Sequence, residues 1–182
     1  MAFNNSLPAP DFSRIRGLAF DVDGVFTDGG ILCDLSGELY RTFDAKDGFG
    51  IRMASLNGYH VGIITGGRSA SIAARFKSCG VNAEDVYLGS RDKIADFEDF
   101  CTRHGLEPSE VLYIGDDIPD IPVIEACGIG ACPSDAVPEV KEVCDYVSAF
   151  PGGKGCVRDA VEKVLKTQGK WVFDVKGYKA RF

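Results

Sequence analysis

Short apolar runs alternate along the chain with longer stretches in which apolar residues recur every three to four positions. The runs have the length and composition of buried β-strands. They cover residues 17–20, 60–65, 86–89, 111–115 and 128–132, with a weaker sixth run at 146–149. The longer stretches have helical spacing and end at glycine, as helices commonly do. They cover residues 47–58, 69–80, 91–105 and 120–128.

This alternation predicts an α/β fold with a mainly parallel sheet. The stretch 29–44 departs from it, because two short strand-like segments flank a turn at Ser36-Gly37. That pattern predicts a β-hairpin that projects from the sheet. We expect a single domain over residues 1–182, with its core at about 15–168. The tail at 169–182 is expected to be either disordered or docked on a partner.

Composition and charge narrow the class of protein. Hydrophobic residues make up 45% and charged residues 26% of the chain, as in globular proteins. The net charge of -7 argues against binding to nucleic acid or to an anionic membrane. The chain shows neither a signal-peptide pattern nor an apolar run of membrane-spanning length, so we expect a cytoplasmic protein. An anionic substrate would then require a metal ion or a few Lys and Arg side chains.

Polar residues stand where the apolar runs end. In an open parallel sheet, ligands bind in the crevice beyond the carboxyl ends of the strands. The residues at or after these ends are Asp21 and Asp23, Thr65 and Gly66, Lys93, and Asp116 and Asp117. We therefore expect these side chains to share one site.

Phosphoryl transfer suits this set of side chains. Asp21 and Asp116 supply carboxylate oxygens, the ligands that Mg²⁺ prefers. Asp21 is the expected nucleophile, which forms an aspartyl phosphate. Asp23 is expected to protonate the leaving alcohol and then to activate the attacking water. Thr65 and Lys93 are expected to hold the phosphoryl oxygens as negative charge spreads over them.

Each of these elements also has a simpler explanation. Asp-x-Asp-Gly is more often a turn or a helix cap than a nucleophile, and Lys93 alone suits an exposed helix. The joint order at successive strand ends favours catalysis. A phospho-accepting receiver domain has similar residues but places its paired acids first, whereas Asp116 and Asp117 come late here. A dinucleotide-binding oxidoreductase is disfavoured, because no Gly-x-Gly-x-x-Gly follows the first run.

The same residues resemble the motifs of the haloacid dehalogenase superfamily of phosphotransferases. The segment DVDGVFT at 21–27 is similar to its first motif, Asp-x-Asp-Gly-x-x-Thr/Ser. Thr65 and Lys93 correspond to the second and third motifs. The fourth corresponds to GDDIPD, with Asp116, Asp117 and Asp120. This resemblance implies a Rossmann-like three-layer α/β/α sandwich.

A narrower resemblance, over about residues 15–170, is to the bacterial 3-deoxy-D-manno-octulosonate 8-phosphate (KDO 8-phosphate) phosphatases. The segments that carry it are DVDGVFTDGG, KDGFGIRMASLNGYHVGIITG, YIGDDIPDIPVIEACG and GGKGCVRDAVEKVLKTQGKW. It implies a Mg²⁺-dependent hydrolase that releases KDO and phosphate during lipopolysaccharide biosynthesis. It also implies a protein without a cap domain, and a homotetramer whose neighbouring subunits help to close each active site.

Residue roles follow from the resemblance as well. The implied catalytic residues are Asp21, Asp23, Thr65 and Lys93. The implied metal ligands are Asp21, Asp23 and Asp116, with Asp117 and Asp120 in support. The implied substrate-binding residues are Thr27, Gly66, Arg75 and Arg158. An arginine suits the carboxylate of the sugar better than a lysine does, because its guanidinium donates two parallel hydrogen bonds.

Two departures from the family pattern leave the substrate open. Gly67 stands where the family commonly has the Arg of Thr-Gly-Arg. The segment GSRDK at 89–93, which ends at Lys93, stands where a loop that contains Gln-Gly is usual. A related branch that acts on nine-carbon, sialic-type sugar phosphates carries an acidic residue at the position of Gly67, so its absence favours the eight-carbon substrate. The alternatives are a phosphatase of such a nine-carbon sugar and a non-catalytic oligomerisation domain.

Overall fold

The computed structural model describes residues 10–171 and confirms the α/β architecture. Its main sheet has six strands in the order β5-β4-β1-β6-β7-β8, and neighbouring strands run parallel. These strands are β1 (Gly17–Phe20), β4 (His60–Thr65), β5 (Val86–Leu88), β6 (Val111–Ile114), β7 (Ile129–Cys132) and β8 (Tyr146–Val147). Each overlaps a run predicted from the sequence.

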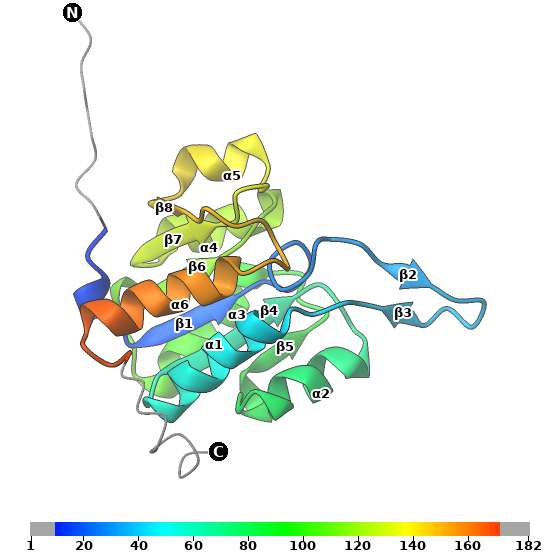
Figure 1. The fold of residues 1–182 in the computed structure, drawn as a ribbon, viewed down its shortest axis with the longest axis horizontal. Helices are drawn as coiled ribbons and strands as arrows, with labels where there is room; N and C mark the ends of the chain where they lie inside the picture. The colour runs from blue at the N-terminus through cyan, green and yellow to red at the C-terminus, as the bar shows by residue number, and fades with distance from the viewer. Residues whose placement is uncertain (1–9, 172–182) are drawn as a thin grey trace, which may run out of the picture.

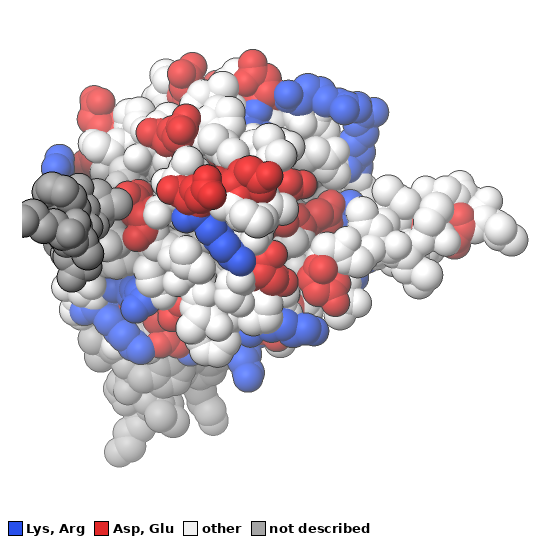
Figure 2. All heavy atoms as spheres, turned by 90° about the horizontal axis from the view of Figure 1, so that it is seen from above, with Lys and Arg blue, Asp and Glu red and all other residues white. Residues whose placement is uncertain are grey.

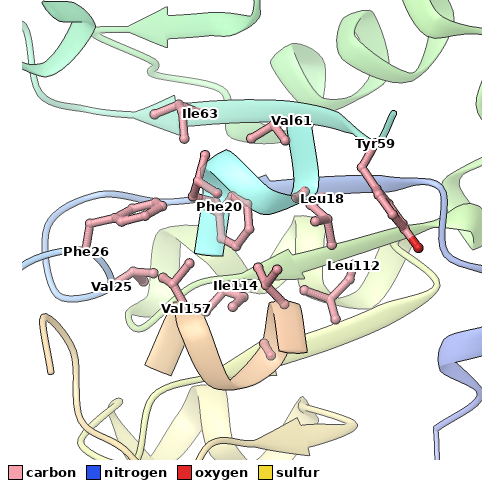
Figure 3. Packing of buried hydrophobic residues seen from close by; sticks show 14 of the residues in the cluster. Leu18, Phe20, Val25, Phe26, Tyr59, Val61, Ile63, Leu112, Ile114 and Val157 are labelled. Atoms are coloured by element: carbon pink, nitrogen blue, oxygen red, sulfur yellow. The ribbon is translucent and has the colours of Figure 1, made fainter. Parts of the chain in front are cut away.

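The central strand β1 determines where a ligand can bind. It pairs with β4 on one side and β6 on the other, so the order of strands reverses beside it. The carboxyl end of β1 is therefore at the switch point of the sheet, where a crevice forms. Leu18 and Phe20 point to one face and Ala19 to the other, and all three are fully buried. Figure 3 shows Leu18 and Phe20 packed among apolar side chains of the neighbouring strands, Val61, Ile63, Leu112 and Ile114.

Helices cover both faces of the sheet (Figure 1). The face of Phe20 packs against α1 (Ala45–Leu56), α2 (Ala70–Ser78) and α6 (Cys156–Thr167). The opposite face packs against the remaining helices, α3 (Lys93–His104), α4 (Ile121–Ala126) and α5 (Pro138–Val143). Burial of apolar surface on two faces stabilises the sheet, and truncating a buried aromatic such as Phe20 to Ala would cost about 3–5 kcal/mol.

Helices α5 and α6 are absent from the elements expected above. Helix α6 follows a glycine-rich segment, and its N-cap residue is Gly155, which has no side chain to accept hydrogen bonds from the first amides of the helix. Instead, the buried carboxylate of Asp47 in α1 accepts hydrogen bonds from the amides of Gly155 and Arg158, at 3.1 and 2.8 Å. The start of α6 is thus capped from another helix, which leaves no local sequence signal.

The predicted hairpin is confirmed, with strands of two residues each. Strands β2 (Leu32–Cys33) and β3 (Leu39–Tyr40) pair antiparallel and project from the sheet (Figure 1). Leu32 is 71% exposed and Leu35 is fully exposed. Figure 2 shows that this projection carries few charged side chains. A two-stranded hairpin on its own is at most marginally stable in water.

The rest of the described chain leaves the crevice uncovered. Between β1 and β6 it contains the hairpin, three α-helices and two short 3-10 helices besides the strands, so residues 10–171 include no cap domain. None of the helices in this range has the length and apolar character needed to cross a bilayer. The expected tail at 169–182 lies outside the described residues from position 172 onward.

Candidate active site

The polar residues at the strand ends meet in one cleft at the carboxyl edge of the sheet. The cleft has a volume of about 390 Å³. Its lining contains most of the residues predicted from the sequence, namely Asp21, Asp23, Thr65, Gly66, Lys93, Asp116, Asp117 and Asp120. It also contains Gly67, Ser90, Arg91 and Pro119. The position of the cleft follows from the strand order, as expected for an open parallel sheet.

Asp21 is held in place by the sheet itself. It directly follows β1, and its amide donates to the carbonyl of Ile114 in β6 at 2.9 Å. The residue is 6% exposed. Because the ladder between β1 and β6 extends through this hydrogen bond, the backbone of Asp21 is as firmly placed as a residue of the strand.

Gly24 and Thr27 shape the turn that follows Asp21. Gly24 has a φ of +92°, and a Cβ there would lie 2.0 Å from Oδ2 of Asp116, so a glycine is required. The buried hydroxyl of Thr27 accepts hydrogen bonds from the amides of Gly24 and Gly29, both at 3.2 Å. The turn is therefore closed by Thr27, and its glycine allows Asp116 to approach.

Asp120 organises the opposite side of the cleft. Its Oδ1 accepts from Nζ of Lys93 at 2.7 Å and from the hydroxyl of Tyr113 at 2.6 Å. Its Oδ2 accepts from the amides of Asp116 and Asp117 at 3.1 and 3.3 Å. This buried carboxylate thus fixes both the ammonium group of Lys93 and the backbone that carries Asp116.

Negative charge is in excess in the cleft. Burial, followed by the charge of Asp120, raises the pKa of Asp21 from 3.8 to about 7. Burial, followed by the charges of Asp21 and Asp120, raises the pKa of Asp116 to about 8. Burial by itself lowers the pKa of Lys93, but the two carboxylates beside it outweigh that effect and the net shift is upward. Since one ammonium group does not neutralise this set of acids, the site favours a further cation.

The carboxylates are arranged to share such a cation. Oxygens of Asp21, Asp116 and Asp120 all lie within 4.8 Å of one another. Oδ1 of Asp116 is buried and has no hydrogen-bond partner among residues 10–171, an arrangement that is costly unless a ligand completes it. Because Asp120 already accepts from four donors, Asp21 and Asp116 have the oxygens best placed for a divalent ion such as Mg²⁺.

Asp23 is paired with an arginine from the hairpin segment. Nε of Arg41 lies 2.6 Å from Oδ1 of Asp23, and Nη2 lies 2.9 Å from Oδ2. The expected metal ligands include Asp23, but its carboxylate is directed to Arg41. The carboxylate that lies close to those of Asp21 and Asp116 is that of Asp120. No local pattern predicts this pair, because its two members belong to different segments of the chain.

Three expected substrate-binding residues do not line the cleft. Thr27 is buried in the turn after β1. Arg75 in α2 donates to the carbonyl of Asp44 at 3.4 Å, and Arg158 in α6 pairs with Glu162 at 2.5 Å. Contact of either arginine with the site of a neighbouring subunit remains a prediction.

The loop after β5 contributes residues that sequence reasoning did not assign. The amides of Gly89 and Ser90 donate to the carbonyls of Gly67 and Thr65, at 2.8 and 2.9 Å, which places this loop beside the end of β4. The buried hydroxyl of Ser90 has no hydrogen-bond partner in the described part of the chain. Ser90 and Arg91 follow the end of a strand, so the strand-end rule applied to β5 would have found them.

Comparisons with known proteins point to one family. Residues 51–128 match the model of haloacid dehalogenase-like hydrolases. The 3-deoxy-D-manno-octulosonate 8-phosphate phosphatase KdsC of Escherichia coli K12 is 37% identical over 157 residues, which are 86% of this chain and 82% of that protein. The crystal structure of the phosphatase of the same name from Yersinia pestis has a TM-score of 0.84 at 34% identity, over 87% of this chain and 85% of that one.

A third relative was solved with ligands. The 3-deoxy-D-manno-octulosonate 8-phosphate phosphatase from Moraxella catarrhalis, in complex with a magnesium ion, a phosphate ion and a KDO molecule, has a TM-score of 0.84 at 31% identity. The match covers 93% of this chain and 94% of that one. Identity at this level over most of both chains establishes membership, and this chain belongs to the 3-deoxy-D-manno-octulosonate 8-phosphate phosphatase family of haloacid dehalogenase-like hydrolases.

Proposed function

We propose that this chain is a Mg²⁺-dependent phosphatase that hydrolyses KDO 8-phosphate to KDO and phosphate, a step of lipopolysaccharide biosynthesis in the cytoplasm. The observation that carries the proposal is the cleft in which Asp21 and Asp116 converge with Lys93 at the switch point of the sheet. The names of the relatives from E. coli and Y. pestis support the substrate, and so do the ligands of the M. catarrhalis structure.

The first chemical step transfers the phosphoryl group to Asp21. A carboxylate oxygen of Asp21 attacks phosphorus while the bond between phosphorus and the sugar oxygen breaks, and that oxygen takes a proton from Asp23. We propose that Nζ of Lys93, 2.9 Å from Oδ1 of Asp21, and the hydroxyl of Thr65 stabilise the phosphoryl oxygens. The amide of Gly66 is a further candidate donor at this edge of the cleft.

The second step regenerates the free carboxylate. Water attacks the phosphorus of the aspartyl phosphate and gives a proton to Asp23, while the bond between phosphorus and the oxygen of Asp21 breaks. Phosphate leaves, and Asp23 is again protonated for the next substrate. One carboxyl group thus serves as acid and then as base.

Mg²⁺ fits the donor set of the cleft. We propose Asp21, Asp23 and Asp116 as its ligands, Asp23 through its backbone carbonyl because Arg41 binds its carboxylate. Asp117 and Asp120 act in support, since Asp120 holds the amides of Asp116 and Asp117. When bound, the ion neutralises the carboxylates and stabilises the charge of the transferring phosphoryl group. Its charge would also keep Asp21 ionised, as a nucleophile must be, against the burial that raises the pKa of this group.

We propose in addition that the hairpin packs against other copies of this chain, in a tetramer. Its apolar side chains at Ile31, Leu32 and Leu35 are 47%, 71% and 110% exposed, and apolar surface of this kind marks interfaces. Arg75 and Arg158 are then candidates to bind the sugar carboxylate in the cleft of a neighbouring subunit.

A phosphate-release assay tests the proposed function. The substrates are KDO 8-phosphate, a nine-carbon 2-keto-3-deoxy sugar phosphate and glucose 6-phosphate, each with Mg²⁺ and with EDTA. We expect Mg²⁺-dependent release with the highest kcat/KM for KDO 8-phosphate. A preference for the nine-carbon substrate would contradict the proposed specificity, and absence of release from all three would contradict catalysis.

A further inference from the structure

Arg41 connects the projecting hairpin to the cleft. It directly follows β3, whose residues Leu39 and Tyr40 are 37% and 50% exposed, yet its own side chain is 2% exposed. Two nitrogens of the guanidinium bind the two oxygens of Asp23, at 2.6 and 2.9 Å. Such a two-point pair fixes the plane of a carboxylate as well as its position.

Gly67 provides the space for this guanidinium. A Cβ at position 67 would lie 3.2 Å from Nη2 of Arg41 and 2.7 Å from Cδ1 of Ile72. The methyl end of Ile72 can rotate away, whereas the guanidinium is held by two hydrogen bonds. A side chain at position 67 would therefore displace the methyl end of Ile72 and also press on a guanidinium that has little freedom to move.

A second contact fixes the hairpin at its turn. Oγ of Ser69, the residue before α2, donates to Oε1 of Glu38 at 2.8 Å. Glu38 and Arg41 are thus both tied to loops that follow strands of the main sheet. The guanidinium reaches Asp23 from a segment that is held at two points.

We propose that Arg41 is a positioning residue for Asp23 in the phosphatase reaction, and that Gly67 lacks a side chain so that the guanidinium can reach it. The inference rests on the proposed role of Asp23 as acid and base. The side chain of Asp23 is 28% exposed and sits in a turn, so without a partner it would occupy several rotamers. A carboxylate has about four lone-pair positions and Arg41 occupies two of them, so a position remains for the proton that Asp23 gives to the leaving oxygen of the substrate.

Substitution of Arg41 tests the proposal. We expect Arg41→Ala to lower kcat about 10² fold, the cost of misplacing a catalytic group by about 1 Å, while KM and the Mg²⁺ concentration for half-maximal activity change less than about threefold. Arg41→Lys and added guanidinium ion at non-denaturing concentration should each restore part of kcat. Arg16→Ala, which removes an arginine paired with Glu110 at 3.1 Å outside the cleft, is the matched control and should leave kcat unchanged.

A double-mutant cycle tests the part of Gly67. Gly67→Ala should lower kcat in the wild-type background and have little effect in the Arg41→Ala background, because both changes act on the same contact. Additive effects would overturn the link between Gly67 and Arg41. Circular dichroism of each variant verifies folding, and if Arg41→Ala fails to fold, Arg41→Lys and Gly67→Ala carry the test.

The variant Asp23→Asn distinguishes a failure of the proposed role of Asp23 from a failure of the proposed role of Arg41. If Asp23→Asn retains the full kcat, the proposed function of Asp23 fails whatever Arg41 does. If Asp23→Asn loses activity while Arg41→Ala keeps the wild-type kcat, the positioning role of Arg41 alone is overturned.

Discussion

Asp21 and Asp23 are separated by one residue, yet different parts of the molecule hold them. The backbone of Asp21 is bonded to β6 and its carboxylate lies beside Lys93, deep in the cleft. Asp23 lies in a turn, and its carboxylate is bound by Arg41 from the hairpin segment. The comparison indicates that the sheet places the proposed nucleophile, whereas a segment outside the main sheet places the proposed acid and base.

Removal of the proposed nucleophile should have the largest effect. Asp21→Asn removes the attacking oxygen, so we expect a loss of kcat on the order of 10⁶ fold, as when a covalent nucleophile is deleted. The fold should persist, because the amide replaces a carboxyl whose charge is unfavourable at this depth. Phosphate release and circular dichroism measure the two outcomes, and residual activity within tenfold of wild type would contradict the assignment.

Removal of the proposed acid and base should have a smaller effect. Asp23→Asn leaves the nucleophile in place, so the expected loss of kcat is about 10² to 10⁴ fold. Mg²⁺ binding, measured by calorimetry, should be largely retained. If Asp23→Asn and Asp21→Asn were equally inactive and both lost Mg²⁺, the division of labour between the two residues would be wrong.

The buried charge network should control stability. Lys93→Met leaves Asp21 and Asp120 without the ammonium group that lies 2.9 and 2.7 Å from them. Breaking a buried ion pair typically destabilises a protein by about 3–5 kcal/mol. Arg16→Met, which breaks a more exposed pair, should cost less than about 1 kcal/mol. Urea unfolding compares the two variants, and equal free energies of unfolding would contradict the account.

The stability of the metal-free protein should fall as pH rises. The pKa values of Asp21 and Asp116 are raised by burial to about 7 and about 8, so between pH 4 and 8 the folded state binds more protons than the unfolded state. The free energy of unfolding therefore decreases with pH over that range. Saturating Mg²⁺ should remove most of this dependence, and an increase in stability with pH in EDTA would contradict the pKa shifts.

The smallest effect on the single chain is expected in the hairpin. Leu35 is fully exposed, so Leu35→Asp should change the free energy of unfolding of one chain by less than about 0.5 kcal/mol. If the hairpin packs between copies, the same change should shift the particle mass in light scattering toward smaller species. An unchanged mass for an oligomeric protein would place the interface elsewhere, and a monomeric, active wild type would refute the proposed assembly.

The two sides of the cleft also differ in how far the sequence predicts them. The apolar runs predict each strand of the main sheet, and the residues after the runs identify Asp21, Thr65, Lys93 and Asp116, because the end of a strand is a local feature. The pair of Arg41 with Asp23 has no such signal. It depends on where a hairpin of two-residue strands folds back, which neither periodicity nor spacing defines.

Helix α6 illustrates the same limit in the fold. Its cap is Asp47, a residue of α1 that is distant in sequence. Local rules for helix starts look for Ser, Thr, Asp or Asn immediately before the helix, and glycine stands there. Contacts between distant segments therefore account for what the sequence left open both in the core and in the cleft.

The stereochemical course at phosphorus tests the central claim most directly. KDO 8-phosphorothioate whose two terminal oxygens are different heavy isotopes of oxygen is hydrolysed in ordinary water, and the configuration of the released thiophosphate is determined. Transfer to Asp21 followed by attack of water inverts the configuration twice, so net retention is expected. Net inversion would show a single direct attack by water and would contradict the proposed role of Asp21.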